Sequence, residues 1–259
     1  MRLCANLNYY WLTRSSASST LNICSTASKS HAWIGASFLR QACGRADGHS
    51  HQLREPHVTW LRPIELRGSR ASLVPLNHGH ANDLVEALYD GELWKLWYTS
   101  IPSPDKLVDF IDQRLAAQAK GTLLPFAVLD NATGKAVGTT NYLNVDLDHR
   151  HLEIGGTWYR KNVQRSHVNT QCKLLLLEHA FETLLCIAVE FRTHFFNYQS
   201  RRGIERLGAK LDGILRSHQI ADNGTLRDTC VYSIIASEWP TVKAHLTWQM
   251  ERPRQPEIR

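Results

Sequence analysis

Residues 152–195, LEIGGTWYRKNVQRSHVNTQCKLLLLEHAFETLLCIAVEFRTHF, hold two apolar segments on either side of a helical pattern. The apolar segments, 152–159 and 187–195, are predicted to be strands. Between them a polar loop over 160–169 leads into a helix that we expect from 170 to 185. Strand, helix and strand in this order predict a right-handed parallel crossover, in which the helix starts at the end of the first strand.

The expected helix is amphipathic. Its apolar stripe recurs every three to four residues and predicts a buried face made by Leu174, Leu177, Phe181 and Leu184. The charged residues fall on the other side, so Lys173, Glu178 and Glu182 are expected to face outward.

The flanking sequence supplies the remaining elements. Before the crossover we expect a first strand at 71–76, helices at 81–88 and 103–121, and then a three-stranded meander of 123–129, 135–143 and 152–159 with a turn at 130–134. After it we expect a short helix at 200–207, a hairpin of 211–215 and 228–235 that turns at Asn223-Gly224, and a last helix at 238–250. This order predicts a single α/β (α+β) domain over residues 57–250.

The composition is that of a globular protein, since 43% of the 259 residues are apolar and 21% are charged. No stretch approaches the roughly 20 uninterrupted apolar residues of a membrane span, so we expect a soluble protein without a membrane partner. The six cysteines show no CxxC or paired Cys/His spacing. This argues against a zinc site and favours reduced thiols in the cytoplasm.

The positive charge is spread unevenly along the chain. Residues 1–56 hold six basic and two acidic residues, whereas 57–259 hold 24 and 22, a net charge of +2. A domain so close to neutrality is not expected to have the concentrated basic face of a nucleic-acid-binding protein, so no nucleic-acid partner is predicted.

Residues 1–56 are rich in serine, poor in acids and without helical or strand period, and a domain start is expected near Trp60. An organelle transit peptide has this composition, but a start codon set too far upstream and a genuine flexible tail are alternatives. None of the three gives the segment a catalytic role. Residues 251–259 are expected to form a flexible tail.

Three motifs carry a resemblance to a known family. They are Leu152-Glu153-Ile154-Gly155, the loop at Gln164 that runs into a helix, and Asn197-x-x-Ser200 followed by Glu205-Arg206-Leu207-Gly208. Over residues 60–248 the chain resembles the GNAT superfamily of acyl-CoA N-acyltransferases, nearest to the RimJ/RimL type, the ribosomal-protein-alanine acetyltransferases. The resemblance implies a mixed central sheet with a splayed parallel strand pair, helices on both faces, and acetyl-CoA as co-substrate without a metal.

The resemblance places the coenzyme A pyrophosphate at the loop before the long helix. A helix N-terminus suits an anion, because it presents unpaired N–H groups and a partial positive charge. The residues expected there are Gln164, Arg165, Ser166, His167, Val168, Asn169 and Thr170. The family pattern has small residues at the positions of His167 and Asn169, where glycine permits positive φ and close approach to phosphate. The alternative is an ordinary solvated, basic loop.

The resemblance also implies that strands 152–159 and 187–197 splay apart to admit the pantetheine arm. Contacts with the coenzyme are expected from Thr157, Trp158, Tyr159, Asn197 and Ser200, and a bulge is expected at Gly155-Gly156. Two alternatives remain: the glycines are merely tolerated in an edge strand, and Asn197 and Ser200 cap a helix.

Acyl transfer from a thioester to an amine needs a neutral amine, a place for the oxyanion and a proton for the departing thiolate. Glu153 is the expected base, directly or through water, with a structural hydrogen-bond acceptor as the alternative. A backbone N–H near residues 155–157 would polarise the carbonyl. Tyr198 is the expected acid for the thiolate, with a packed tyrosine as the alternative.

Other polar residues in this region are expected to be structural. Glu190, Arg192 and His194 share one face of their strand, which favours a cross-strand polar ladder over an acid/base cluster. Cys172 and Cys186 lie in apolar segments with no adjacent base, which favours packing over nucleophilic catalysis. Direct attack of the amine in a ternary complex is therefore expected.

The connection between the first two helices is expected to border the acceptor. It contains Glu92, Trp94, Trp97 and Tyr98, a combination of acid and aromatic rings that suits an amine, with core packing as the alternative. We therefore expect an N-acetyltransferase that acts on a primary amine, either a small molecule or a protein N-terminus, as a monomer or homodimer. A non-catalytic module on the same fold, which binds acyl-CoA or a protein, is the alternative.

Overall fold

The computed structural model of the chain describes residues 60–252. The expected extension at 1–56 and residues 253–259 of the expected tail lie outside the described residues. The first described residues pack onto the domain, since Trp60, Leu61 and Ile64 contact the main core cluster.

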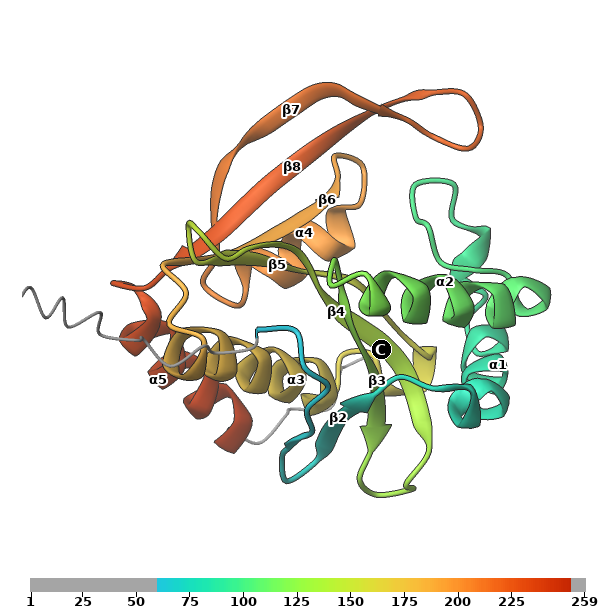
Figure 1. Ribbon diagram of the computed structural model, residues 1–259, viewed down its shortest axis with the longest axis horizontal. Helices are drawn as coiled ribbons and strands as arrows, with labels where there is room; N and C mark the ends of the chain where they lie inside the picture. The colour runs from blue at the N-terminus through green and yellow to red at the C-terminus, as the bar shows by residue number, and fades with distance from the viewer. Residues whose placement is uncertain (1–59, 253–259) are drawn as a thin grey trace, which may run out of the picture. The chain divides into compact units, whose positions relative to one another are not determined.

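A mixed sheet forms the centre of the fold, and within the described residues it has eight strands in the order β1-β2-β3-β4-β5-β6-β8-β7 (Figure 1). The strands are β1 (Leu66–Arg67), β2 (Ala71–Pro75), β3 (Leu124–Asp130), β4 (Ala136–Asp146), β5 (His151–Tyr159), β6 (Ala188–His194), β7 (Lys210–Ile220) and β8 (Leu226–Ile235). Neighbouring strands are antiparallel except β5 and β6, which are parallel. The predicted meander and parallel crossover are confirmed.

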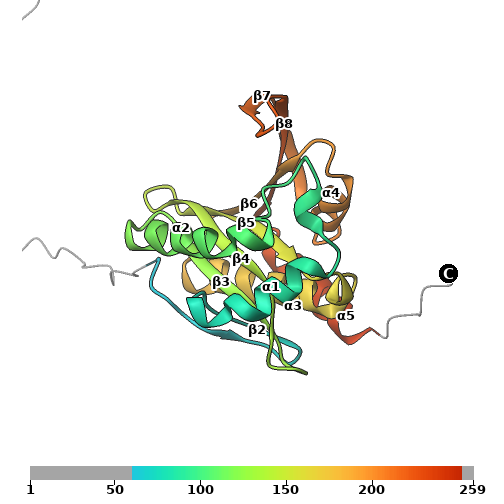
Figure 2. The ribbon, with the colours of Figure 1, turned by 90° about the vertical axis from the view of Figure 1, so that its right-hand side faces the viewer.

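Helices cover both faces of this sheet (Figures 1 and 2). They are α1 (Ala81–Tyr89), α2 (Leu107–Ala119), α3 (His167–Glu178), α4 (Tyr198–Glu205) and α5 (Trp239–Glu251). Alternate side chains of β3 enter two different cores: Phe126 and Val128 pack in a cluster with Leu176 of α3, whereas Ala127 packs in a cluster with Leu84 of α1. The expected helices on both faces are confirmed.

Helix α3 begins three residues earlier than the sequence pattern predicts. The Ser166 hydroxyl accepts a hydrogen bond from the Val168 N–H at 3.2 Å and caps the helix. A π-helical turn, His179–Thr183, continues it. The outward positions of Glu178 and Glu182 are confirmed, since both carboxylates bind the Lys243 ammonium at 2.7 Å.

The first half of α3 is enclosed on more sides than the sequence pattern predicts. Lys173 is only 6% exposed, so the prediction that it faces outward is wrong. Gln171 is buried as well, and its Oε1 accepts hydrogen bonds from the N–H groups of Arg70 and Ala71 at 2.6 and 2.9 Å. The residues that lead into β2 therefore cover a side of α3 that would be predicted to face solvent from its polar residues alone.

The C-terminal hairpin, β7 and β8, is longer than predicted and extends away from the rest of the sheet (Figures 1 and 2). The residues of β7 are exposed apart from Gly213, which is half-buried. Pairing with β8 passes through two irregular positions, Leu211/Gly213 and Leu215/Gln219. Backbone pairing with β8 thus holds β7 as a strand although its residues do not alternate between apolar and polar. The sequence pattern therefore predicts only the first half of β7.

Candidate functional site

Strands β5 and β6 pair with each other only at their first three residues. Their last pair is Glu153 with Glu190. Beyond it β5 runs on to Tyr159 and β6 to His194 without pairing to each other in the described structure. The expected splay is confirmed, and it starts at Glu153.

An irregular position in the pairing of β4 with β5 accompanies the splay. Thr139 pairs with Trp158 and Asn141 with Gly155, so β5 holds one more residue than β4 over this stretch. Gly156 has a φ of +57°, and the Asn141 amide donates to the carbonyl oxygens of Gly155 and Gly156 at 3.0 and 3.4 Å. A Cβ on Gly156 would lie 2.6 Å from Asn141 Nδ2. The expected bulge at Gly155-Gly156 is confirmed, and it requires glycine at 156.

The space between the diverging strands opens into a groove of about 1300 Å³. The groove continues past the loop before α3 to α4 and the end of α5, and on its other side it reaches the connection between α1 and α2. Thr157, Trp158 and Tyr159 of β5 line it, and their contact with a coenzyme stays a prediction.

The groove is strongly basic. The described residues that line it contribute one carboxylate, that of Glu153, and eight Lys or Arg side chains: Arg114, Arg165, Lys173, Arg192, Arg202, Arg206, Arg227 and Arg252. The net charge of residues 57–259 is close to zero, but the groove holds a local concentration of positive charge. An anionic ligand fits this groove better than a neutral or cationic one.

The start of α3 faces the groove. Four of the residues expected at the phosphate loop line it, namely Gln164, Arg165, Ser166 and Asn169. The other three do not: His167, Val168 and Thr170. Val168 packs in the main core cluster, and Thr170 is 1% exposed.

The non-glycine residues at His167 and Asn169 do not strain the loop. Both have helical backbone inside α3, and the left-handed residue of the loop is Arg165, with a φ of +58°. The conformational freedom of glycine is therefore not needed at either position. The N–H groups of the first turn have no acceptor within the helix, as at any helix start.

Side-chain hydrogen bonds fix this loop to its neighbours. The Gln164 amide donates to the carbonyl oxygen of Tyr159 at 2.9 Å, and its Oε1 accepts from Gln199 at 3.4 Å. The Arg206 guanidinium, after α4, donates to the Thr170 hydroxyl at 3.2 Å. The start of α3 is thus held against both β5 and the end of α4.

Asn197 and Ser200 line the groove at the start of α4. Asn197 Oδ1 accepts a hydrogen bond from the Ser200 N–H at 3.0 Å and caps the helix. The capping role left open by the sequence is therefore present, and contact with a coenzyme stays a prediction.

Tyr198 does not line the groove. Its residue is 52% exposed, and its ring lies 6.4 Å from the Phe195 ring and 5.6 Å from the Arg201 guanidinium. This half-exposed position outside the groove lining supports neither the packed-tyrosine alternative nor the expected role as acid for the thiolate.

Glu153 lies where the strands part and lines the groove. Burial raises the pKa of its carboxyl, and the Asn144 amide, which donates to Oε2 at 2.7 Å, and the positive charge of Arg192 oppose this rise. A buried carboxylate with a raised pKa suits a base that works near neutral pH. The hydrogen bond from Asn144 shows that Glu153 is also a structural acceptor.

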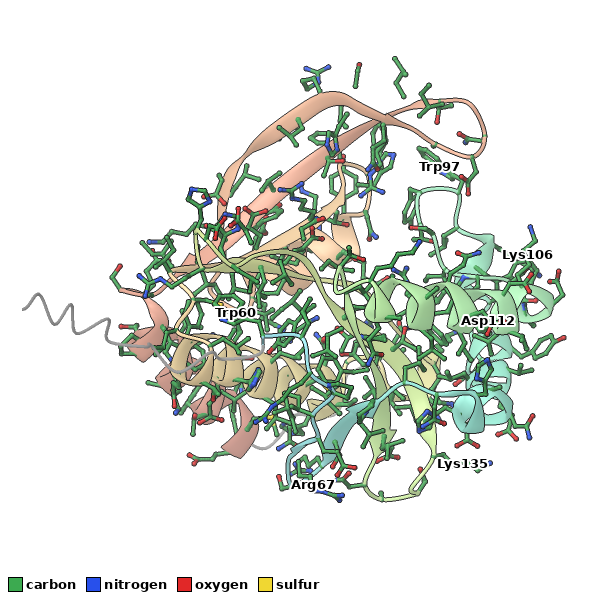
Figure 3. All side chains as sticks on the ribbon, in the orientation of Figure 1. Trp60, Arg67, Trp97, Lys106, Asp112 and Lys135 are labelled. Atoms are coloured by element: carbon green, nitrogen blue, oxygen red, sulfur yellow. The ribbon has the colours of Figure 1, made fainter. Side chains whose placement is uncertain are left out.

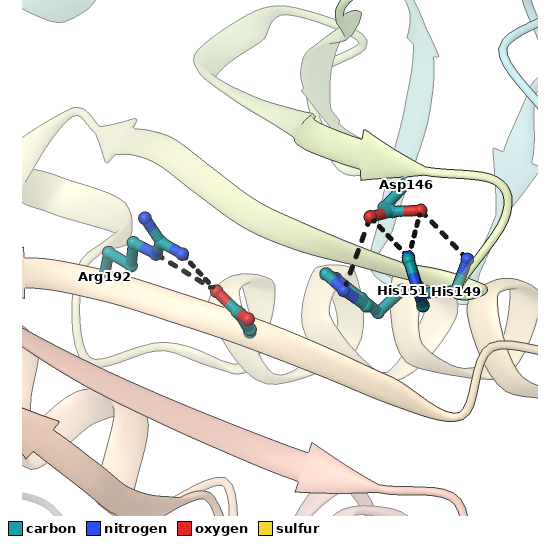
Figure 4. Close-up of polar contacts among 5 residues, drawn as sticks. Asp146, His149, His151 and Arg192 are labelled. Atoms are coloured by element: carbon teal, nitrogen blue, oxygen red, sulfur yellow. Dashed lines mark hydrogen bonds and ion pairs between the residues drawn. The ribbon is translucent and has the colours of Figure 1, made fainter.

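Arg192 binds its neighbour on the strand, Glu190, with two hydrogen bonds. Its Nε and Nη2 donate to one Glu190 carboxylate oxygen at 3.0 and 2.8 Å (Figure 4). Arg192 Nε lies 3.7 Å from Glu153 Oε2 on the neighbouring strand. The favoured polar ladder is present for these three residues.

His194 does not join this ladder, because it is 3% exposed and packs among aromatic rings. Its Nδ1 accepts a hydrogen bond from the Phe196 N–H at 3.1 Å, and burial lowers its pKa. The rings of Trp97 and Tyr98 lie 5.1 and 6.3 Å from the His194 ring, between centroids.

Of the four residues expected to border the acceptor, only some lie at or near the groove. Tyr98 lines the groove. Trp97, labelled in Figure 3, lies in the connection between α1 and α2, is half exposed, and has its ring 5.1 Å from that of the groove residue His194. Glu92 and Trp94 do not line the groove: Glu92 binds Lys95 at 2.6 Å on the surface, and Trp94 packs against the second core cluster. For Trp94 the geometry favours the core-packing alternative.

Lys173 is a groove residue that the sequence analysis missed. Its Nζ donates to the Thr157 hydroxyl at 2.8 Å and lies 3.4 Å from the Thr140 hydroxyl. Burial lowers its pKa to about 7. A lysine in an amphipathic helix normally faces water, so the sequence carries no signal for this position.

The described cysteines are buried and free. Burial raises the thiol pKa values of Cys172 and Cys186 to about 12, which leaves both thiols protonated and confirms the packing role. Cys4, Cys24 and Cys43 lie outside the described residues.

No cluster of three or more His, Cys, Asp or Glu residues between residues 60 and 252 is arranged to hold a metal ion. Over the same range, no helix combines the length and the apolar character needed to cross a membrane.

The family model of the Acetyltransferase (GNAT) domain matches residues 70–210, more than half of the chain. The chain belongs to the GNAT acetyltransferase family. The splayed strands, the bulge at Gly156 and the start of α3 all lie within the matched residues. No curated protein matches the chain.

Solved structures share this GNAT fold. A T. thermophilus protein described as an acetyltransferase is 30% identical, with a TM-score of 0.65, and the match covers 74% of this chain and 99% of that one. A GCN5-related N-acetyltransferase from Brucella melitensis is 28% identical, with a TM-score of 0.65 and coverage of 72% and 86%. Mycobacterium smegmatis RimJ, solved with CoA-disulfide, is 21% identical, with a TM-score of 0.62 and coverage of 75% and 97%, a likeness in fold alone.

Proposed function

We propose that this GNAT protein transfers an acetyl group from acetyl-CoA to a primary amine by direct attack in a ternary complex. The observation that carries the proposal is the basic groove that joins the gap between β5 and β6 to the start of α3. A thioester tail needs a narrow space with backbone partners, and a diphosphate needs positive charge and N–H donors. Both are found along one groove.

The residues of the groove fit the coenzyme from end to end. Arg165, Asn169 and the N–H groups at the start of α3 that Ser166 does not cap would hold the pyrophosphate. Unpaired backbone groups of β5 and β6 beyond Glu153 would bond the amides of the pantetheine arm, since buried peptide groups need partners. Acetyl-CoA supplies the activated acyl group.

Glu153 is the base in this proposal. Its carboxylate takes a proton from the amine, directly or through one water molecule, as the amine nitrogen attacks the carbonyl carbon. Its place at the parting of the strands and its raised pKa support the role. Backbone N–H groups near residues 155–157 would polarise the carbonyl oxygen.

The acceptor side is proposed to be formed by Tyr98 and neighbouring residues of the connection between α1 and α2. The motifs at Asn197 and Glu205 support the RimJ/RimL type, whose acceptors are protein N-termini, and a small amine is the second possibility. We propose a cytoplasmic protein, monomeric or homodimeric, without a nucleic-acid partner.

The test is release of free thiol from acetyl-CoA with a panel of amines that contains small amines and peptides with free N-termini. The proposal predicts amine-dependent release and an amide product of the acetylated mass. Binding of CoA without release by any amine, at any pH between about 6 and 9, would instead support the non-catalytic module.

A further inference from the structure

Lys173 occupies the floor of the gap between the diverging strands. Its Nζ lies 2.8 Å from the Thr157 hydroxyl on β5 and 6.0 Å from the centroid of the Phe191 ring on β6. Thr157 and Phe191 both lie beyond Glu153 and Glu190, the last pair between the two strands. The amine of α3 thus reaches the space that opens where strand pairing ends, and it lines the groove.

Among residues 60–252 the ammonium of Lys173 has no carboxylate in direct contact. Its partners in the described part of the chain are the hydroxyls of Thr157 and Thr140 and the ring of Phe191, and no described carboxylate lies within 4 Å. A buried ammonium without an anion is unfavourable. An anion placed in the gap would remove this penalty, so the site favours a ligand that carries or develops negative charge there.

Titratable groups surround Lys173 on each neighbouring element. On α3 the Cys172 thiol is protonated, because its pKa is about 12. On β5 Glu153 is the source of negative charge, and the Tyr159 phenol is neutral, because burial raises its pKa. On β6 Arg192 is held by Glu190. Burial brings the pKa of Lys173 to about 7, so the amine gains and loses a proton near neutral pH.

We infer that Lys173 is the acid that serves the departing sulfur, an assignment that rests on the proposed function. As the amine nitrogen forms its bond to the carbonyl carbon, the bond from that carbon to sulfur breaks. Glu153 receives the proton of the amine, and Lys173 gives its proton to the sulfur. The products are the amide and the free thiol. A proton passes from Glu153 to Lys173, directly or through water, to restore both groups.

This assignment gives the groove two groups with opposite tasks. Burial shifts the pKa of Glu153 upward and that of Lys173 downward to about 7, which brings the two pKa values closer together. Tyr198 stands outside the groove lining, and the Thr157 hydroxyl is already shared with Lys173 and with Thr140, at 2.8 and 2.7 Å. Lys173 is therefore the better-placed proton donor.

The test is a titration of the thiol of bound CoA by the ultraviolet absorbance of its thiolate, in the full-length wild type and in K173M. A positive charge beside the sulfur lowers the pKa of a thiol, so the wild type should hold at least about tenfold more thiolate at neutral pH than K173M does. K120M, which changes an exposed lysine outside the groove lining, is the matched control and should titrate like the wild type.

A second measurement needs no variant. Carbon NMR of labelled lysines in the wild type follows the titration of Lys173, whose pKa should rise when CoA binds and should not rise with desulfo-CoA, the analogue that lacks the sulfur atom. A merely structural lysine would respond equally to both ligands. Equal thiol titration in wild type and K173M, or equal lysine titration with both ligands, overturns the assignment while leaving the proposed function intact. Failure of CoA to bind the wild type overturns both.

Discussion

Arg192 is bound to Glu190 at 2.8 Å, while its distance to Glu153 is 3.7 Å. The guanidinium therefore balances the charge of Glu190 first and that of Glu153 only in part. Because burial outweighs this weaker contact, the pKa of Glu153 stays above its ordinary value. A direct Arg192–Glu153 pair would instead make Glu153 a poor base near neutral pH.

E153Q is expected to lower kcat at neutral pH by about 10²- to 10⁴-fold, because the amide cannot accept the proton of the amine. The affinity for CoA should change little, since Gln keeps the size of the side chain and an oxygen for Asn144. Steady-state kinetics and calorimetry with CoA check the two statements. E182Q is the control, a surface carboxylate bound to Lys243. Unchanged turnover in E153Q would eliminate Glu153 as the base.

E190Q is expected to shift the acid side of the pH–rate profile to lower pH. The substitution removes a negative charge that raises the pKa of Glu153 and weakens the hold on Arg192, which can then move toward Glu153. Both effects lower the pKa of the base, so it stays ionised to a lower pH. The check is kcat/KM measured against pH, with E178Q as the control. An unchanged profile, or a shift to higher pH, would contradict this coupling between Glu190 and the base.

G156A is expected to destabilise the protein by at least about 1–2 kcal/mol, because an L-residue is strained at a φ of +57°. The added Cβ would also meet Asn141 Nδ2 at 2.6 Å and disturb the hydrogen bonds that hold the bulge. Urea unfolding measures the loss of stability, and CoA affinity should fall with it. G213A is the control, since a Cβ there meets no atom within 4 Å. Equal effects of the two variants would show that the bulge does not depend on Gly156.

Cys172 and Cys186 are expected to resist alkylation in the folded protein. Both are buried, and with thiol pKa values of about 12 they hold almost no thiolate at neutral pH. Treatment with iodoacetamide followed by mass analysis of the peptides that contain them checks this. An acetyl group trapped on either sulfur would contradict direct attack and indicate an acyl-enzyme.

The parts of the site that depend on chain order and local pattern could be predicted from the sequence. The crossover places the start of α3 at the end of β5, so the loop could be predicted from chain order. The splay was implied by the resemblance to the GNAT family, and Gly155-Gly156 was consistent with a bulge there. Glu153 was found because the resemblance places its strand beside the thioester.

The parts that depend on packing could not be predicted. Lys173 is buried because the diverging strands cover its side of α3. The helical periodicity of the sequence shows which residues are polar, but it does not show which elements pack against each side of the helix. The basic groove could not be predicted because its arginines come from separate elements of the chain. In the net charge of the domain, surface acids cancel their positive charge. The long exposed β7 is held by its pairing with β8 and not by an apolar pattern.

A crystal structure of the protein with CoA would examine whether the coenzyme lies along this groove. The expected result is a diphosphate beside Arg165 and Asn169 at the start of α3, a pantetheine arm between β5 and β6, and the sulfur nearer to Glu153 than to Gln164. A coenzyme bound outside the gap, or strands β5 and β6 paired beyond Glu153 and Glu190 in the complex, would contradict the transferase mechanism proposed for this chain.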